Sequence, residues 1–364
     1  MNSIQTTNQY VPDYLVTPGE VLEEYLEYSG FTQVSLANRT GLSTKTINEI
    51  IKAKCAITAE TALKFERTLG RPAHFWSNLE RQYQEDKTRL ADKILLEEYL
   101  HWHALFPANE MAKLGWIEKC TEKIHQLDAL LRFFAVASPK QWEAIWVHDL
   151  QTAFRTTERS QKDSANISAW LRRGEIEAQQ LPCSQIDKKK FKNSLDEIRK
   201  LTVEEPKVFI PKLKSICAAA GVAIVFIPAL PRLGIYGATR QLNDKYIMQL
   251  SLYGKSNDQL WFTIFHEACH IIKHPGRDLY LEENGLDNEN ENEANIFARD
   301  TLIPSAQLNN FLAPYFRPTL DQIKKFAADI GIAPGIVVGR LQHDKKIPRS
   351  QGNDLKVWYE WVRE

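Results

Sequence analysis

Apolar positions recur at helical spacing through the first part of the chain, about residues 17–84. Pro18 can begin a helix there, since proline fits the first turn of a helix. Residues 31–51 then hold two apolar stretches separated by Gly41, a pattern that predicts a helix, a tight turn and a second helix. These signals predict five short helices. The apolar residues expected to face inward around the turn are Leu36, Ala37, Leu42, Ile47 and Ile50.

Residues 88–204 also carry apolar residues at helical spacing, so we expect a helical middle region. Breaks are expected at Phe106-Pro107 and at residues 137–139. The pattern does not choose among a linker, a dimer interface and a sensor. Three tryptophans of this region are expected in the core rather than in a ligand platform: Trp142, Trp146 and Trp170.

The last part of the chain shows both the helical spacing of apolar residues and the spacing typical of strands. The pattern predicts a helix over about 206–220 and then three strands, over 221–228, 234–239 and 245–251. A helix that is apolar nearly all round follows, and another begins at about Glu291 and ends near Pro304. The predicted fold is therefore multidomain and mainly α, with a five-helix N-terminal domain, a helical middle region and a C-terminal α+β domain with a small sheet.

Length and composition limit the number of domains and indicate the cellular compartment. The chain has 364 residues, 43% of them hydrophobic and 25% charged, with a formal net charge of +0. This length allows two or three domains, and we expect three parts, at residues 1–85, 86–204 and 205–364. No apolar run is long enough for a membrane span, and the first ten residues lack a signal-peptide core. The five cysteines show no CxxC spacing, so we expect no disulfide framework and a cytoplasmic protein.

The most specific chemical signal is the stretch from His266 to His270, which spells HEACH and fits the pattern HExxH. Residues four apart lie nearly one above the other on a helix, so His266 and His270 can bind one ion. Glu267 is placed to act on a water molecule as general base. The alternative is a satisfied polar cluster in the core. Two histidines and a glutamate in a buried helix need partners, which favours a metal site and predicts a zinc-dependent hydrolase.

A catalytic zinc ion needs a third protein ligand, and two glutamates compete for that role. Glu293 shares its helical face with bulkier residues, among them Ile296 and Phe297. Glu291 lies on a face of smaller residues that could pack closely against the histidine helix, so we prefer Glu291 and keep Glu293 as the substitute. That face also holds Ala294, Asn295, Ala298 and Leu302.

Four other features lie near this motif. His274 could be a fourth metal contact, a hydrogen-bond partner of a ligand or a helix-end residue. Cys269 would point away from both histidines in an ideal helix, so we expect it to pack and not to bind metal. Tyr236 could donate to a developing oxyanion, although packing is the simpler role. The run from Asp278 to Glu293 holds seven acidic residues and no basic one, which is typical of a solvated loop.

HEACH followed by ENEANIFARDTLIP resembles the ImmA/IrrE metallopeptidases, over about residues 205–345. The resemblance implies a gluzincin-like zincin domain that cleaves transcriptional repressors. Carried onto this chain, it makes His266, His270 and Glu291 the Zn²⁺ ligands and Glu267 the base. It also implies a repressor or antitoxin as the protein substrate.

The N-terminal motifs PGEVLEEYL, Thr32–Ile51 and ITAETALKFERTLGRPAHFW resemble the XRE-type helix-turn-helix domain of HigA-like antitoxins. The resemblance implies binding to double-stranded operator DNA, with the second helix of the motif in the major groove. A helical protein-interaction module is the alternative. Ser43 and Thr58 are also suited to cap helices. By position, the candidate base readers are Ser43, Thr44, Lys45 and Asn48, and the candidate phosphate contacts are Gln33, Lys52, Lys54 and Thr58.

Charge bears on how such a domain would bind. Residues 1–84 hold eight basic and nine acidic residues, about −1 overall, so a lone domain should bind DNA weakly. Residues 43–54 are locally positive, with three lysines against Glu49. This distribution favours a homodimer on a palindromic operator, where two modest patches act together.

The two motifs together predict a cytoplasmic DNA-binding regulator with zinc-dependent endopeptidase activity. The alternative is a HigA-like antitoxin or transcriptional repressor that binds a toxin, and whose zincin domain is structural or sensory. Glu267 favours the first hypothesis, because a structural zinc ion has no need of a base.

Overall fold

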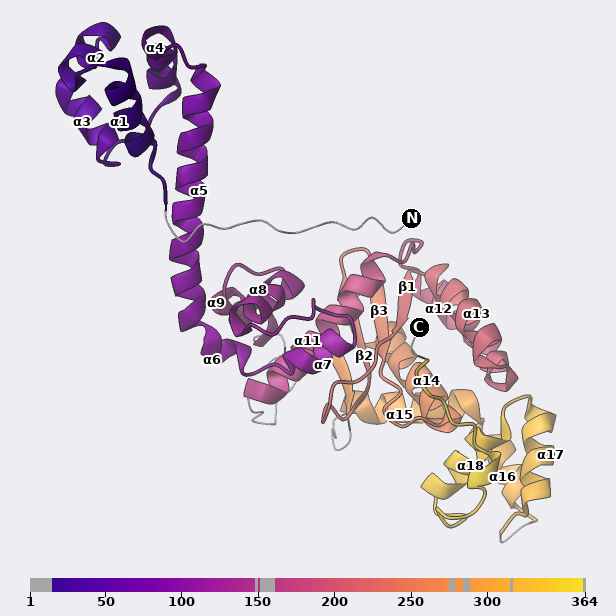
Figure 1. The fold of residues 1–364 in the computed structure, drawn as a ribbon. Helices are drawn as coiled ribbons and strands as arrows, with labels where there is room; N and C mark the ends of the chain where they lie inside the picture. The colour runs from indigo at the N-terminus through magenta and orange to yellow at the C-terminus, as the bar shows by residue number, and fades with distance from the viewer. Residues whose placement is uncertain are drawn as a thin grey trace. The chain divides into compact units, whose positions relative to one another are not determined.

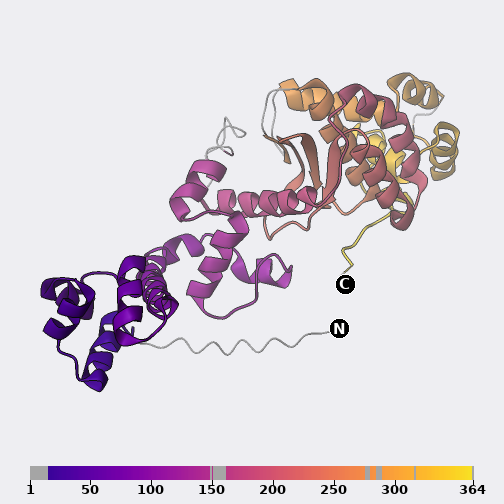
Figure 2. The same cartoon turned by 90° about the horizontal axis from the view of Figure 1, so that it is seen from above.

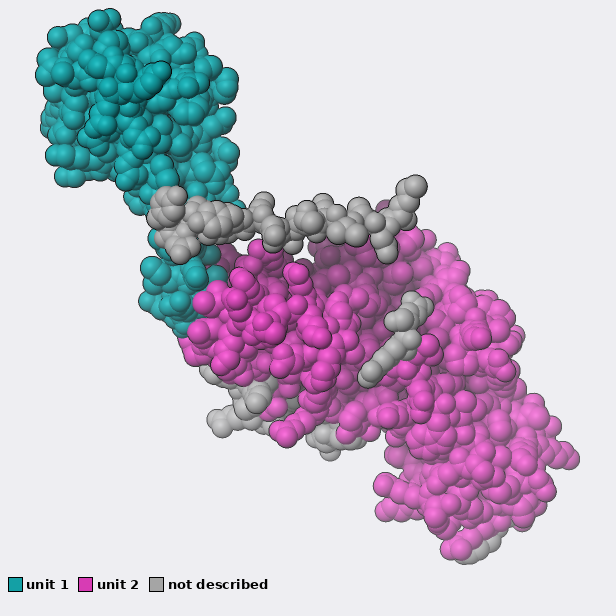
Figure 3. All heavy atoms as spheres, viewed as in Figure 1, with its two compact units in different colours: residues 1–99 teal, residues 100–364 magenta. Residues whose placement is uncertain are grey.

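The computed structural model describes residues 15–147, 150, 161–274, 279–283, 289–314 and 317–362. The chain forms two compact units, residues 1–99 and 100–364, which Figure 3 colours separately. Helices predominate, and a small mixed sheet lies in the second unit. The prediction of a mainly α, multidomain fold with a small C-terminal sheet is confirmed. Within the described part of the chain, no helix is both long and apolar enough to cross a membrane.

From residue 15 onward, five helices form the first unit (Figure 1): α1 (Pro18–Ser29), α2 (Gln33–Thr40), α3 (Thr44–Ile51), α4 (Ala59–Leu69) and α5 (Ala73–Glu98). Each of the first four helices is capped at its start by a side-chain oxygen that accepts a hydrogen bond from a backbone N–H of the first turn. The capping residues are Thr17, Thr32, Ser43 and Thr58. Gly41 ends α2 at φ 72°, a left-handed conformation that glycine adopts without strain. Four of the five residues predicted to face inward are buried, and Leu42 packs against them half-buried.

Helices also open the second unit: α6 (Leu100–His103), α7 (Ala108–Lys113), α8 (Lys123–Phe134), α9 (Pro139–Trp142), η1 (Glu143–Val147) and α11 (Gln161–Gln179). Their aromatic side chains pack edge to face. The ring of Trp102 lies 4.7 Å from that of Phe106 and 5.7 Å from that of Trp142. Trp142, Trp146 and Trp170 are all buried, so the prediction that they belong to the core is confirmed.

A four-stranded sheet follows, built from β1 (Val222–Phe226), β2 (Ile235–Leu242), β3 (Lys245–Leu250) and β4 (Leu279–Glu283) in the order β1-β3-β2-β4. β1 runs parallel to β3, with Ala223 opposite Ile247, and β2 is antiparallel to both β3 and β4. The three predicted strands are confirmed. The expectation of a solvated loop after residue 278 is wrong for Leu279–Glu283, because these residues pair with β2.

Helices cover both faces of this sheet (Figures 1 and 2). α11 packs on one face, where the Trp170 indole donates to the Ile227 carbonyl and the Gln249 amide donates to the Trp170 carbonyl. The other face packs against α14 (Asn257–Lys273), through Thr239 among others. The division of the chain into three parts, at residues 85 and 204, stays a prediction. In the structure, α11 packs against the sheet within the second unit.

The further α-helices described in the second unit are α12 (Lys188–Lys200), α13 (Pro206–Ala218), α15 (Glu289–Leu302), α16 (Ser305–Leu312), α17 (Leu320–Ile330) and α18 (Pro334–His343). α14 packs most extensively against α15 and also against α18. Arg199 of α12 donates to the carbonyls of Leu302 and Ile330, which ties the end of α15 to the end of α17. These contacts fix α15 beside α14, where the chemistry suggested by the sequence lies.

Candidate metal centre

Helix α14 is buried along almost its entire length. His266 and His270 are each 1% exposed and Glu267 is 0% exposed. A helix buried to this extent places its polar side chains in a water-poor environment, where each needs a polar partner or an ion. The spacing of four residues turns both imidazoles to the same side, toward α15.

Glu291 of α15 meets these two imidazoles. Its Oε2 lies 3.0 Å from His266 Nε2, and its Oε1 lies 3.5 Å from His270 Nε2. The two histidine Nε2 atoms are themselves 3.1 Å apart. Within the described residues, these three side chains form a group whose ligand atoms all lie within 4.8 Å of one another. The structure thus brings together the two predicted histidines and the preferred glutamate.

Hydrogen bonds on the far side of each ring determine which nitrogen is available. His266 Nδ1 lies 3.0 Å from Asn295 Oδ1, and an amide oxygen only accepts, so Nδ1 carries the proton. His270 Nδ1 lies 3.0 Å from His274 Nδ1, and His274 Nε2 lies 2.9 Å from the Glu293 carboxylate. The carboxylate accepts from His274 Nε2, which leaves His274 Nδ1 to accept from His270 Nδ1. With the proton on Nδ1, each Nε2 is the nitrogen available to bind an ion beside Glu291.

The electrostatics favour a neutral His270 and an ionised Glu291. Burial lowers the pKa of His270 below its ordinary value, although hydrogen bonding to Glu291 acts in the opposite direction. Burial would raise the pKa of Glu291, but its interactions with His266 and His270 outweigh this effect and lower that pKa to about 2. Two neutral imidazoles and one ionised carboxylate, converging in a buried site, are the donor set that zinc takes in catalytic centres. The residues present therefore fit a zinc ion.

A fourth residue, Tyr280, holds His270 from the side of the sheet. Its ring stacks on that of His270 with centroids 4.2 Å apart, and its hydroxyl donates to the His274 carbonyl at 2.9 Å. Tyr280 belongs to β4, the strand that the sequence did not predict. Asn295 and Tyr280 were not among the predicted site residues, and the only signal for Asn295 was its place on the small-residue face with Glu291.

Glu267 lies on the side of α14 that meets β2. An added Cβ at Gly237 would lie 2.8 Å from Glu267 Oε1 and 2.7 Å from the Thr263 methyl group, so the strand can approach this carboxylate only because residue 237 is glycine. The Thr239 hydroxyl lies 3.5 Å from the Glu267 carbonyl. Glu267 is therefore held between the helix and the sheet, adjacent in sequence to His266.

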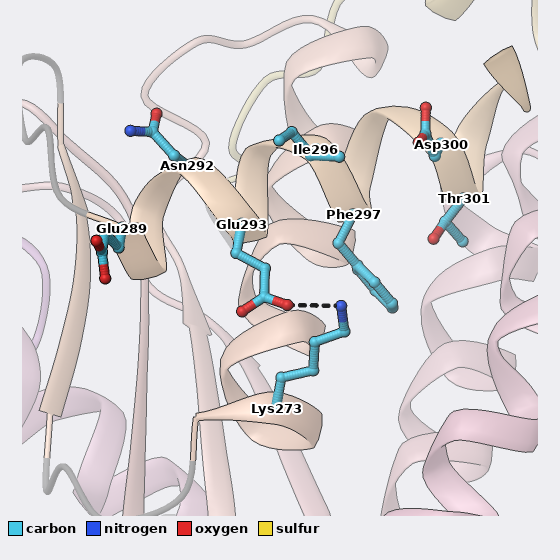
Figure 4. Close-up of a pocket in the computed structure, with 8 residues that line it drawn as sticks. All are labelled: Lys273, Glu289, Asn292, Glu293, Ile296, Phe297, Asp300 and Thr301. Atoms are coloured by element: carbon cyan, nitrogen blue, oxygen red, sulfur yellow. Dashed lines mark hydrogen bonds and ion pairs between the residues drawn. The ribbon is translucent and has the colours of Figure 1, made fainter.

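The other predicted residues near the motif do not belong to the three-residue group. Glu293 is on the outer face of α15, where its carboxylate binds Lys273 Nζ at 2.8 Å (Figure 4). His274 follows the last residue of α14 and contacts His270 without belonging to the three-residue group. Cys269 is buried, and burial raises the pKa of its thiol to about 12, so it packs as a neutral group. Tyr236 stacks edge-on against Tyr253.

A cleft with a volume of about 880 Å³ opens beside the metal centre. His266, Glu291, Asn295 and Tyr236 line it, together with residues from α15, α18 and the segment after α18. A cleft of this size can accept several residues of an extended chain.

The predicted DNA contacts lie in the first unit. Lys45, Lys52 and Lys54 are exposed, and Lys45 Nζ lies 3.9 Å from a Glu49 carboxylate oxygen on the same helix. Ser43 and Thr58 cap α3 and α4 through their hydroxyl groups, as predicted. Thr44 is exposed, and Gln33 and Asn48 are half-buried. The lysines and Thr44 are thus accessible from solvent.

A family comparison supports a metallopeptidase-type domain around this centre. Residues 217–342 match the model of the peptidase M78 family, described as the IrrE N-terminal-like domain. The match spans about a third of the chain and includes α14, α15 and the whole sheet. The C-terminal region is therefore an IrrE N-terminal-like domain, and the prediction of an ImmA/IrrE domain is confirmed.

The remaining comparisons concern the N-terminal region. Virulence-associated protein I of Dichelobacter nodosus is 41% identical over 69 residues, which are 19% of this chain. The chain spans 64% of the length of that relative, just under two thirds. An addiction module antidote protein of the HigA family from Coxiella burnetii is 27% identical, over 23% of this chain and 91% of its own, with a TM-score of 0.21. A Pseudomonas aeruginosa protein solved with its operator DNA is 27% identical, over 24% of this chain and 93% of its own, with a TM-score of 0.23.

Proposed function

We propose that this chain is a cytoplasmic DNA-binding regulator whose C-terminal domain is a zinc-dependent endopeptidase of the gluzincin type. The observation that carries the proposal is the convergence of His266 Nε2, His270 Nε2 and the Glu291 carboxylate in a buried site that opens onto a cleft. The substrate that fits a regulator with a DNA-binding domain is a repressor-type or antitoxin-type protein.

The proposed chemistry divides between the ion and the chain. When bound, a zinc ion acts as a Lewis acid that polarises a carbonyl group and lowers the pKa of water. His266, His270 and Glu291 hold the ion, and Asn295 and His274 keep the two imidazoles in the required tautomer. The Glu267 carboxylate takes a proton from water and passes it to the nitrogen of the leaving amine.

The DNA-binding half of the proposal rests on the first unit. α2 and α3 are joined through Gly41 in a helix-turn-helix, and the amino-terminal residues of α3 include exposed Thr44 and Lys45. A helix presented in this way fits the major groove. Because the domain carries about equal positive and negative charge, we propose that it binds a palindromic operator as a homodimer.

The function as a whole can be tested in cells. A strain that expresses the chain should lose one repressor-type or antitoxin-type protein, as measured by quantitative proteomics. The same strain carrying Glu267→Gln should retain that protein. Equal levels of every such protein in both strains would instead favour an antitoxin-like repressor whose zincin domain is structural or sensory.

Substitutions on α3 are expected to weaken binding to the promoter of the protein's own gene. Lys45→Ala should reduce affinity by about fivefold through loss of a charged contact, and Asn48→Ala by about tenfold through loss of a base contact. Gel shifts at two salt concentrations measure both effects. Lys64→Ala is the control, since Lys64 lies on α4 and pairs with Glu60. Unchanged affinity in both α3 variants would contradict this mode of binding.

Asn295→Ala is expected to weaken zinc binding by about 10- to 100-fold, the usual effect of removing a partner that orients a histidine ligand. Without the Asn295 amide, His266 Nδ1 loses its acceptor and the ring can rotate or change tautomer. Competition with a zinc-chelating dye measures the affinity. Asn309→Ala, at an exposed position on α16, serves as the control. An unaltered zinc affinity would mean that Asn295 does not orient the ring.

A further inference from the structure

The cleft beside the metal centre is lined by more positive than negative charge. Four arginine and lysine side chains face two carboxylates, Arg299, Arg340, Arg349 and Lys356 against Asp258 and Glu291. The Glu291 carboxylate is occupied by His266 and His270. The charge that the cleft presents to a ligand therefore depends on which of the other charged side chains already have partners.

Two of the cations are neutralised within the protein. Lys356 Nζ lies 2.8 Å from Asp258 Oδ2, with both side chains 11% exposed. Arg340 Nε lies 2.6 Å from Asp344 Oδ2. Among the residues that the structure describes, neither Arg299 nor Arg349 lies within ion-pair distance of an acidic group, and the only side-chain hydrogen bond of Arg299 goes from its Nε to the Asn295 carbonyl at 3.3 Å. Their two guanidinium groups keep unused donors on the cleft wall.

The position of Arg299 relative to the centre follows from the helix. Glu291, Asn295 and Arg299 succeed one another at intervals of four on α15, so they share the face that lines the cleft. Eight residues at 1.5 Å per residue place Arg299 about 12 Å from Glu291 along the helix axis. An extended peptide advances about 3.3 Å per residue, so about 12 Å corresponds to three or four peptide residues.

Arg349 is presented by a segment whose backbone is held in place. The Gln342 amide donates to the carbonyls of Arg349 and Gln351, at 3.1 and 2.9 Å, and the Asn353 amide donates to the Arg349 carbonyl at 3.0 Å. Gln342 and Asn353 also line the cleft. The segment that carries Arg349 is thus fixed to the end of α18, and this exposed arginine is offered from a defined position.

We propose that Arg299 and Arg349 form a subsite that selects peptide substrates with an acidic side chain three or four residues from the scissile bond. The inference rests on the proposed endopeptidase function and names its substrate class. A guanidinium group binds a carboxylate through two parallel hydrogen bonds, which makes arginine suited to a single glutamate or aspartate. Nucleic acid would place a phosphate at every nucleotide, and two isolated cations beside carboxylates do not match that regular spacing.

The test measures binding, so that it does not depend on turnover. The full-length chain carrying Glu267→Gln, loaded with zinc, is titrated into two fluorescein-labelled dodecapeptides that differ only in glutamate or glutamine at alternate positions. The glutamate peptide should bind about tenfold more tightly, as expected for a charge-assisted hydrogen bond. Arg299→Gln and Arg349→Gln should each abolish most of this preference, whereas Arg299→Lys should keep part of it. Arg132→Gln, at an exposed position on α8, should keep all of it.

Equal binding of the two peptides, or a preference that survives both arginine substitutions, would overturn the subsite. So would tighter, Arg299-dependent binding of a labelled single-stranded oligonucleotide, because the cleft would then take phosphates. Arg349 is exposed, so its substitution does not threaten the fold and serves as the second variant if Arg299→Gln is unstable. If the wild-type protein hydrolysed no peptide but the preference for the glutamate peptide remained, the endopeptidase function would be contradicted and the subsite would stand.

Discussion

Glu291→Gln is expected to remove zinc from the purified protein, from one ion per chain to less than about a tenth of that after dialysis. The substitution keeps the volume of the side chain but replaces an ionised carboxylate by a neutral amide. Glu291 is the only negative ligand in the group, and its pKa of about 2 keeps it ionised throughout the physiological range. Losing it should weaken zinc binding by more than about 100-fold, a larger effect than the loss of a residue that merely orients a ligand. Elemental analysis together with native mass spectrometry measures the zinc content per chain.

The control for this variant lies on the same helix. Glu289→Gln removes an exposed carboxylate from the first turn of α15 and should leave one zinc ion per chain. Glu293→Gln distinguishes the two glutamates that competed as third ligand. If Glu293→Gln emptied the centre while Glu291→Gln left it full, the ligand assignment would be reversed. Full zinc occupancy in both variants would contradict the glutamate ligand altogether.

Helix periodicity made much of this centre predictable. His266 and His270 meet because four residues make about one helical turn, and Glu291 was preferred because its face carried small residues. That face is buried in the structure, with Ala294 and Ala298 each 0% exposed. Glu293, on the opposite and bulkier face, binds Lys273. Both results follow from the spacing of residues along a single helix, which can be read from the amino-acid sequence alone.

Contacts between distant segments were not predictable in the same way. β4 was missed because Leu279–Glu283 is short and lies in an acidic run, and its pairing with β2 is a property of both strands together. Tyr280 could not be connected with His270 without that strand. Asn295 was placed on the correct face, but its hydrogen bond to His266 depends on how closely α15 packs on α14. The charge of the cleft wall depends likewise on which cations find partners, since the helices α16, α17 and α18 separate Arg299 from Arg349 in the sequence.

Glu267→Gln is expected to lower the rate of peptide hydrolysis by about 10³-fold while zinc content and fold remain unchanged. Glutamine has nearly the same shape, so it can occupy the space against Gly237, but an amide cannot accept a proton at neutral pH. Cleavage is followed by mass spectrometry on a proteome-derived peptide mixture, with zinc content and thermal unfolding recorded on the same samples. Glu110→Gln, at a half-exposed position on α7 where the carboxylate pairs with Lys113, is the matched control and should cleave at the wild-type rate. Because a structural zinc centre has no use for a base, undiminished cleavage by a zinc-replete Glu267→Gln protein would exclude the proposed role of this carboxylate.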